Sequence, residues 1–175
     1  MTPAGFHFAP LSGEHDRKSF CCGEEALDRY LQTQATQDIR RNIANCFVAV
    51  EIATGKVAAY YTLSAASIPL VDLPPEETKH LPRYPTLPAV RIGRLAVGER
   101  FHGRGLGAAT LMDAPRRTIQ GAAVAYAILV DAKNDRGAAF YRHHGFRDLV
   151  SRPRALFLSI VTMQQALYQK RRPKA

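Results

Sequence analysis

Apolar and polar positions follow two different periods along the chain, and these periods separate helical from extended segments. Apolar residues recur every three to four positions over residues 24–42, which predicts an amphipathic helix with one face on the core. Residues 46–52 and 57–63 are rich in β-branched and aromatic residues on either side of a short turn at Gly55, which predicts a β-hairpin. Residues 1–20 carry a weaker strand pattern. The first part of the chain therefore mixes helix and strand.

A proline-rich stretch then interrupts the pattern. Residues 69–89 hold six prolines and predict a long connection, of the kind that often carries function in a compact domain. After it, the pattern predicts strands at 88–97 and 123–130, helices at 104–120 and 134–144, and a final pair of strands at 146–150 and 155–161. We expect a single domain over residues 1–168, followed by a basic, disordered tail at 169–175.

The predicted helix at 104–120 contains a proline at its centre. Pro115 removes one backbone hydrogen bond and clashes with the preceding turn, which costs about 3 kcal/mol in a regular helix. We therefore expect a kink or a helix restart near Ala114.

Charge and cysteine content narrow the classes of function. The 175 residues carry 24 Lys and Arg against 15 Asp and Glu, a formal charge of +9, which favours a polyanionic ligand or partner. Cys21, Cys22 and Cys46 form neither a disulfide framework nor a metal-binding pair, so we expect a reducing compartment, the cytoplasm. No apolar run is long enough to span a bilayer, and we expect no membrane association.

A glycine-rich loop follows the predicted strand at 88–97. Gly103, Gly105 and Gly107 leave backbone N–H groups uncovered at the positive end of the next helix, which predicts a cradle for a pyrophosphate. Gly103, Gly105 and Ala108 also fit a dinucleotide-binding fingerprint. Against it, five residues separate Val97 from Gly103, and too few residues follow to complete a doubly wound sheet. A P-loop is excluded because no Gly-Lys-Ser or Gly-Lys-Thr occurs.

Two segments together resemble the GCN5-related N-acetyltransferases. Arg100-x-x-Gly103-x-Gly105 after Leu95-Ala96-Val97 is similar to their coenzyme-binding motif, and residues 134–146 are similar to their Asn…Phe-Tyr-x-x-x-Gly-Phe segment. The resemblance implies an α/β (α+β) fold with a mixed, largely antiparallel sheet of six to seven strands, about four helices, and a splay between strands 88–97 and 123–130. It implies acetyl-coenzyme A as co-substrate, held by Leu95, Ala96, Val97, Arg100, His102, Gly103, Arg104, Gly105, Leu106, Gly107, Ala108 and Asn134. On local grounds, Asn134 precedes a predicted helix and fits an N-cap better than a ligand contact.

Acetyl transfer to an amine also needs a proton donor for the departing thiolate and an uncharged nitrogen. The resemblance makes Tyr141 the general acid, although a core aromatic beside Phe140 fits the local pattern equally well. No general base stands out, since Glu99 and Asp131 fit surface or capping roles better. An α-amine, with a pKa of about 7.7–8.0, is partly neutral without a base, so the sequence favours an α-amine acceptor. The histidines lack further ligands at metal-binding spacing, and we assign no metal.

A narrower resemblance covers nearly the whole chain. Residues 20–35, 60–63, 91–97 and 129–134 look like the acetyltransferase toxins of bacterial toxin–antitoxin modules. That likeness implies acetylation of the α-amine of aminoacyl-tRNA, arrest of translation and neutralisation by a ribbon-helix-helix antitoxin. We assign contacts with tRNA to Arg40, Arg41, Arg91 and Arg94. Two alternatives stay open, namely a protein N-terminus or small amine as acceptor, and a non-catalytic nucleic-acid-binding domain. Homodimerisation and the preferred tRNA also stay open.

Overall fold

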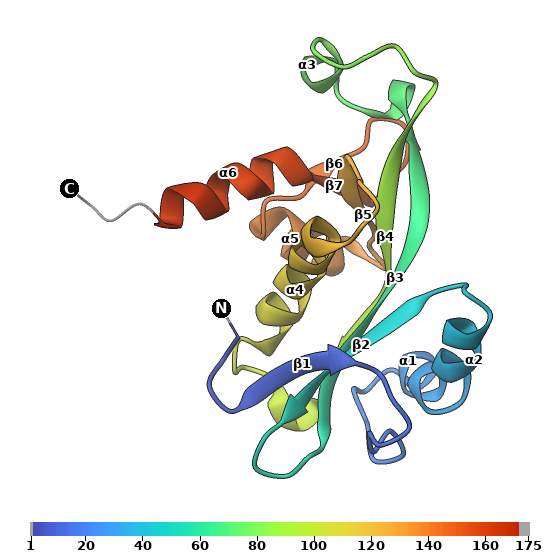
Figure 1. Cartoon of the computed structure of the whole chain (residues 1–175), viewed down its shortest axis with the longest axis vertical. Coiled ribbons are helices and arrows are strands. Elements are labelled where there is room, and N and C mark those ends of the chain that lie inside the picture. Colours follow the sequence, from blue (N-terminus) through green and yellow to red (C-terminus); the bar gives the residue numbers. More distant parts are fainter. Residues whose placement is uncertain (1, 172–175) are drawn as a thin grey trace. The chain divides into compact units, whose positions relative to one another are not determined.

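The computed structural model describes residues 2–171, which form a mixed α/β fold (Figure 1). Its seven-stranded sheet has the order β1-β2-β3-β4-β5-β7-β6. The pairs β1–β2, β2–β3, β5–β7 and β6–β7 are antiparallel, which confirms the predicted fold class. The chain divides into two compact units, one of Met1–Ser64 with Ile92–Arg116 and the other of Ala65–Arg91 with Arg117–Ala175. The single-domain assignment and the splay between strands stay predictions.

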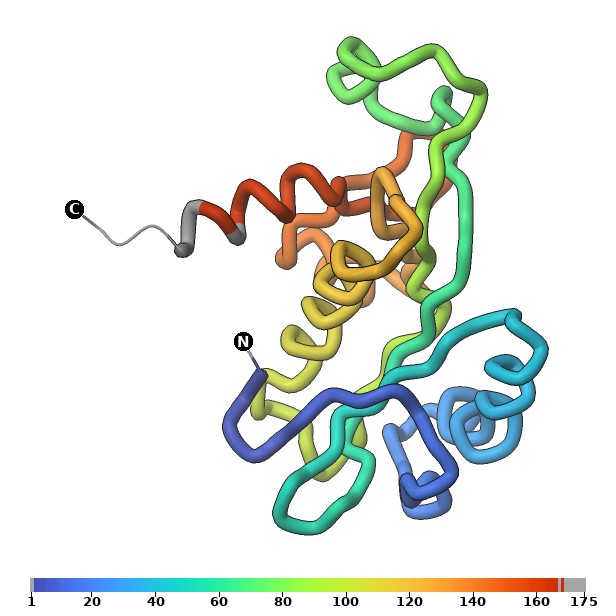
Figure 2. The backbone as a smooth tube through the Cα atoms, in the orientation of Figure 1, coloured from blue at the N-terminus to red at the C-terminus, as the bar shows by residue number. Residues whose placement is uncertain are grey.

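The first unit contains β1 (Phe6–Pro10), β2 (Asn45–Glu51), the first part of β3 (Val57–Pro69) and the end of β4 (Thr86–Val97). The hairpin of β2 and β3 confirms the sequence pattern and can be followed in Figure 2. Consecutive residues of β2 point to opposite faces of the sheet and belong to different core clusters. Val48 shares a cluster with Leu31 and Tyr60, whereas Ala49 shares one with Phe6 and Leu106. Both faces of this part of the sheet are therefore covered.

The predicted helix at 24–42 forms with an interruption. It consists of α1 (Glu25–Arg29), a π-helical segment (Tyr30–Gln34) and α2 (Ala35–Arg40). Tyr30 and Leu31 are buried in the π-helical segment, and the Tyr30 hydroxyl donates to Asp38 Oδ2 at 2.8 Å. The predicted apolar face is therefore the one that packs on the sheet.

The second unit contains β5 (Ala127–Asp131), β6 (Arg147–Asp148) and β7 (Ala155–Ser159), with α5 (Asp135–His143) and α6 (Ile160–Arg171). Here the sequence prediction was wrong at the end of the chain. The last strand stops at Ser159, and a helix follows in place of residues 160–161 of the strand and 169–171 of the disordered tail. Ile160 and Met163 are buried and hold α6 to the unit. Residues 172–175 of that predicted tail lie outside the described residues.

The proline-rich connection is shorter and more structured than predicted. β3 extends to Pro69 and β4 begins at Thr86, while a 3₁₀ turn (Leu70–Asp72) and α3 (Pro75–Thr78) occupy the residues between them. Pro75 stands at the first position of α3, where its missing N–H leaves no hydrogen bond unmade.

The predicted restart near Ala114 is also wrong, because α4 (Leu106–Gln120) runs through Pro115. Pro115 is buried, and the preceding turn is anchored by the Tyr61 hydroxyl, which donates to Asp113 at 2.7 Å. Arg116 pairs with the same carboxylate. The tertiary contact of Asp113 with Tyr61 and the local ion pair of Asp113 with Arg116 thus offset the hydrogen bond that the proline removes.

Candidate functional site

The glycine-rich loop connects the end of β4 to α4 within the first unit. Gly98 N–H donates to the Ala58 carbonyl at 2.8 Å, and a 3₁₀ turn (Glu99–Phe101) follows. Phe101 is buried against Phe6, with ring centroids 5.8 Å apart, and this contact anchors the loop in the core. The loop therefore begins and ends on fixed points, the second being the buried Leu106 at the start of α4.

Backbone conformation explains two of its glycines. Gly103 and Gly105 have φ angles of 73° and 72°, in the left-handed region that side chains with a Cβ rarely adopt. A Cβ built on either glycine would meet no heavy atom within 4 Å, so neighbouring side chains do not demand glycine there. The space beside both residues is open to a ligand.

The loop presents hydrogen-bond donors to that space. Among residues 2–171, no acceptor faces the N–H groups of Gly103, Arg104 or Gly105. Gly107 and Ala108 lie in the first turn of α4, where N–H groups have no intrahelical acceptor. Several donors at the N-terminus of a 15-residue helix suit a diphosphate, so these residues fit the coenzyme predicted for them.

The three basic residues of the loop, His102, Arg104 and Arg100, have different surroundings. One ring nitrogen of His102, Nε2, lies 2.8 Å from the Val97 carbonyl and bridges the beginning of the loop to the end of β4. Arg104 lies over the Phe6 ring at 4.8 Å and 3.4 Å from Glu51 Oε1. Arg100 is exposed and faces no carboxylate in the described part of the chain. Their coenzyme contacts, like those of Leu95, Ala96 and Val97 in β4, stay predictions.

Tyr141 belongs to α5, in the second unit, and both ends of this helix are capped. Asn134 Oδ1 accepts from Gly137 N–H at 2.9 Å, which confirms the predicted N-cap. At the other end, Gly145 has a φ of 89° and donates to the Arg142 carbonyl at 3.0 Å, while Phe146 N–H donates to the Tyr141 carbonyl at 3.1 Å. These two bonds form a Schellman motif.

This cap explains the spacing Tyr-x-x-x-Gly-Phe. The chain must turn through a left-handed residue four positions after Tyr141, and Phe146 then folds back so that its ring lies 5.5 Å from the Tyr141 ring. The motif thus fixes the backbone and the ring of Tyr141 together.

The hydroxyl of Tyr141 differs from those of four other tyrosines, which are buried or half-buried. Each of the following donates a hydrogen bond to the chain: Tyr30, Tyr60, Tyr61 and Tyr126. Within residues 2–171 the Tyr141 hydroxyl has no such partner. Burial raises the pKa of Tyr141 above its ordinary value, so the phenol is protonated at neutral pH. A protonated, unpaired hydroxyl on a fixed helix favours a proton donor over a core aromatic.

The carboxylates near the motifs are engaged elsewhere. Glu99 accepts from the Cys21 thiol at a sulfur–oxygen distance of 3.8 Å, and Asp131 pairs with Arg91 at 2.8 Å. Both carboxylates therefore have partners within the chain, and the identity of a general base stays open. Among residues 2–171, no group of three or more His, Cys, Asp or Glu is arranged to hold a metal ion. No helix within the described range is long and apolar enough to cross a membrane.

The four arginines assigned to tRNA have different surroundings. Arg40 and Arg41 are exposed at the end of α2, without a carboxylate partner in the described chain. Arg94 lies over the Tyr30 ring at 3.6 Å, a contact that the sequence analysis missed because no local pattern connects the two residues. Arg91 belongs to the second unit and is paired with Asp131, so its charge is partly neutralised. Their role with tRNA stays a prediction.

Comparisons with known proteins agree with these features. No family model matches the chain. A tRNA-acetylating toxin of Mycobacterium tuberculosis (strain ATCC 25618 / H37Rv) is 35% identical over 150 residues, which cover 85% of this chain and 88% of that protein. The structure of AtaT complexed with acetyl-methionyl-tRNAfMet matches with a TM-score of 0.85 and 27% identity, over 93% of this chain and 99% of AtaT.

A second AtaT structure holds the coenzyme. It is a tyrosine-to-phenylalanine variant bound to the C-terminus of the antitoxin AtaR and to acetyl-CoA, and it matches with a TM-score of 0.77 and 25% identity over 93% of this chain and 98% of AtaT. Sequence identity to the mycobacterial toxin extends over most of both proteins, and the fold agrees with that of AtaT. The chain therefore belongs to the acetyltransferase toxins, the family that includes the tRNA-acetylating toxin.

Proposed function

We propose that this protein transfers the acetyl group of acetyl-coenzyme A to the α-amine of aminoacyl-tRNA and thereby blocks translation. The observation that carries the proposal is the unpaired, protonated hydroxyl of Tyr141, held by a helix cap in a chain that also has an open glycine cradle. The mycobacterial relative is a tRNA-acetylating toxin, and AtaT binds acetyl-methionyl-tRNAfMet.

The residues have separate roles in this reaction. N–H groups of Gly103 to Ala108 hold the diphosphate of the coenzyme. The amine nitrogen attacks the thioester carbon, a C–N bond forms as the C–S bond breaks, and the nitrogen releases one proton. Tyr141 gives its proton to the departing sulfur, whose conjugate acid has a pKa of about 8.5, and recovers a proton afterwards.

The acceptor we assign is one that reacts without a strong base. Glu99 and Asp131, the two carboxylates beside the motifs, are engaged with Cys21 and Arg91. A lysine with a pKa of about 10.4 stays charged at neutral pH, whereas an α-amine near 7.7–8.0 is partly neutral. The site is therefore suited to an α-amine. A protein N-terminus shares this property, and the experiment below separates it from charged tRNA.

The partners follow from the same assignment. AtaT binds the C-terminus of its antitoxin AtaR, and we assign a neutralising antitoxin of the ribbon-helix-helix class to this protein as well. We also propose that the protein acts in the cytoplasm, where a substrate of this kind would be used.

The test is acetyl transfer by the purified protein with labelled acetyl-coenzyme A and three acceptors: total aminoacyl-tRNA, a peptide with a free N-terminus and a polyamine. We expect label in the aminoacyl-tRNA only. Tyr141→Phe removes one oxygen and is expected to lower kcat about 10²–10⁴-fold while calorimetry shows unchanged coenzyme binding. Labelling of the peptide or polyamine alone would refute the acceptor. A Tyr141→Phe protein as toxic as wild type would support a non-catalytic nucleic-acid-binding domain.

A further inference from the structure

The connection between β3 and β4, residues 70–85, is tied down at its base within the second unit. Leu70 N–H donates to the Pro85 carbonyl at 3.0 Å, which closes the segment into a loop. The buried Asp72 carboxylate accepts from the Ser151 hydroxyl and lies 3.3 Å from Arg152 Nε. The segment therefore leaves the sheet and returns to it at fixed points.

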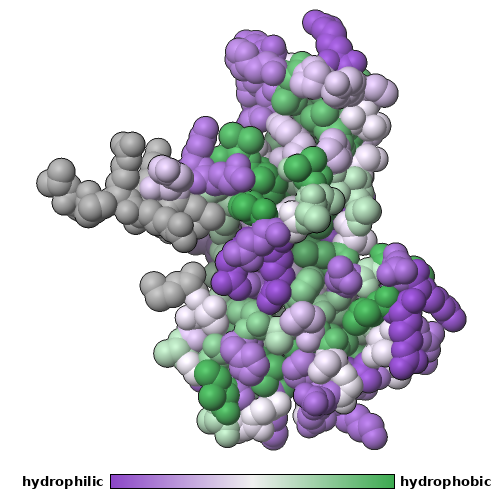
Figure 3. Space-filling model, viewed as in Figure 1, coloured by the Kyte–Doolittle hydropathy of each residue, from purple (hydrophilic) through white to green (hydrophobic). Residues whose placement is uncertain are grey.

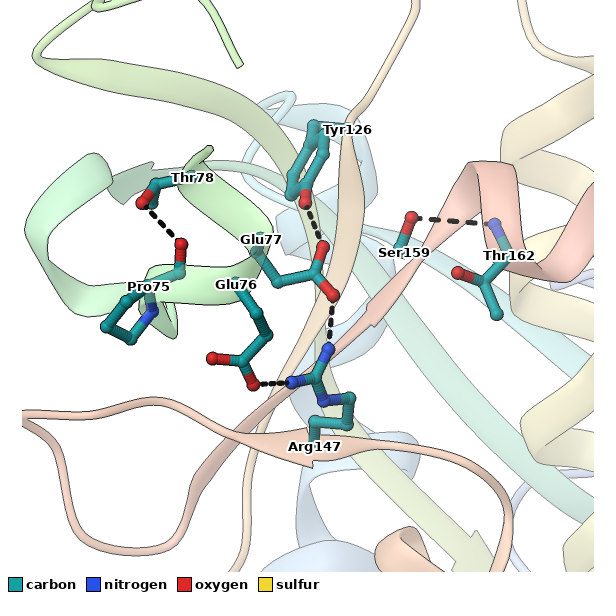
Figure 4. A network of polar contacts seen from close by, with 8 residues as sticks. All are labelled: Pro75, Glu76, Glu77, Thr78, Tyr126, Arg147, Ser159 and Thr162. Carbon is teal, nitrogen blue, oxygen red and sulfur yellow. Dashed lines mark hydrogen bonds and ion pairs between the residues drawn. The ribbon is translucent and has the colours of Figure 1, made fainter. Parts of the chain in front are cut away.

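A second set of contacts holds α3. Glu77 accepts from the Tyr126 hydroxyl at 2.8 Å and also pairs with Arg147, which in turn pairs with Glu76 (Figure 4). Burial and the neighbouring Glu77 carboxylate raise the pKa of Tyr126, so the phenol keeps the proton of this hydrogen bond. Both acidic residues of α3 are therefore engaged with the rest of the unit.

The residues that follow α3 present the opposite charge to solvent. Lys79, His80, Arg83 and Tyr84 are all exposed, and the exposed fraction of Tyr84 is 62%. Neither Lys79 nor Arg83 forms an ion pair with a carboxylate among residues 2–171. Hydrophilic residues gather over α3 and the adjoining chain in Figure 3. We call residues 79–84 the basic tip.

Two cations beside an exposed aromatic ring on a fixed loop match one kind of ligand better than others. Single-stranded RNA offers phosphates to the cations and unstacked bases to the ring. In a duplex the bases are stacked on one another and cannot stack on Tyr84. The carboxylates of an acidic protein surface would pair with the two cations but would not stack on the Tyr84 ring. The two ends of the loop are already held by hydrogen bonds and ion pairs in the free protein. RNA binding therefore has no entropy cost for ordering them.

Resting on the proposed function, we propose that the basic tip binds the single-stranded 3′ end of the aminoacyl-tRNA. Lys79 and Arg83 contact its phosphates, and Tyr84 stacks on one of its bases. Glu77 is a positioning residue that acts through Arg147 and Tyr126.

The test measures binding of fluorescent RNA hairpins, one ending in single-stranded ACCA and one blunt. Tyr84→Ala is expected to weaken binding of the ACCA hairpin about tenfold and to leave the blunt hairpin unaffected. The double variant Lys79→Ala/Arg83→Ala is expected to reduce the salt dependence of ACCA binding, with a slope smaller by about 1.4 for two lost phosphate contacts. The KM for acetyl-coenzyme A should not change in either variant.

A matched control removes two exposed cations outside the tip. Lys18 and Arg29 are exposed and have no carboxylate partner in the described chain, so Lys18→Ala/Arg29→Ala changes the net charge equally. We expect it to keep the preference for the ACCA hairpin. Glu77→Gln keeps an acceptor for Tyr126 and loses the ion pair with Arg147. It should raise the KM for charged tRNA and leave the KM for acetyl-coenzyme A unchanged.

The proposal is overturned if the tip variants bind both hairpins as wild type does, or if the control loses as much ACCA binding as they do. Retained RNA binding with loss of antitoxin binding would assign the tip to a protein interface and also overturn it. Failure of the proposed function is distinct, because wild-type protein would then leave aminoacyl-tRNA unacetylated whatever the tip binds.

Discussion

The cap of α5 offers a quantitative test of how Tyr141 is held. Gly145 has a φ of 89°, and an L-residue in the left-handed region costs about 1–2 kcal/mol. A Cβ at this position would lie 3.8 Å from Leu158 Cδ1, an ordinary contact, so no clash adds to the cost. Gly145→Ala should therefore lower the free energy of unfolding by about 1–2 kcal/mol. For a chain of this size that lowers Tm by about 2–8 °C.

The same substitution should affect catalysis selectively. Relief of the strain at residue 145 weakens the hydrogen bond from Phe146 N–H to the Tyr141 carbonyl, and the Tyr141 ring then loses its fixed direction. We expect a lower kcat with little change in the KM for acetyl-coenzyme A, since the cradle belongs to another part of the chain. Gly145→Asn should fall between wild type and Gly145→Ala, because asparagine tolerates the left-handed region.

Gly13 provides the control for these measurements. Its φ lies outside the left-handed region, and a Cβ there would meet no heavy atom within 4 Å, so neither strain nor a clash opposes the substitution. Gly13→Ala should leave stability unchanged or raise it by about 0.4–1 kcal/mol through the unfolded state. Thermal unfolding and steady-state acetyl transfer of the three variants give both readouts. Equal stability and equal kcat for Gly145→Ala and Gly13→Ala would refute the link between the cap and Tyr141.

Two further predictions concern pH and the cradle. The rate of transfer should rise with pH as an α-amine of pKa about 7.7–8.0 loses its proton. It should fall only at a pH higher than that at which an ordinary phenol titrates, because burial raises the pKa of Tyr141, and Tyr141→Phe should lack this fall. An identical profile in that variant would contradict the acid role. Gly105→Ala should raise the calorimetric Kd for coenzyme A about tenfold, from the loss of roughly 1.4 kcal/mol of binding. Gly5 also has a positive φ, 87°, and open space beside it, so Gly5→Ala serves as the control. It should lower the free energy of unfolding about as much as Gly105→Ala does and leave the Kd for coenzyme A unchanged.

The elements that the sequence predicted correctly are those whose signals are local. The hairpin, the N-cap at Asn134 and the glycine loop each depend on the conformation of a few consecutive residues. α6 was not predicted because, among those of its residues whose burial the structure describes, only Ile160 and Met163 are buried. The continuity of α4 through Pro115 depends on contacts with residues distant in the sequence, such as Tyr61.

By itself, the sequence determined the backbone turns of the glycine loop and of the cap that holds Tyr141, since steric limits on φ act within each residue and its neighbours. Only the tertiary structure decided which charges are engaged. It paired Arg91 with Asp131, set Arg94 over Tyr30, and joined Arg147 to the acidic residues of α3. Residues far apart in the chain come into contact only when the sheet and helices pack. The periodicity of the sequence, which reports on neighbouring residues, does not predict such contacts.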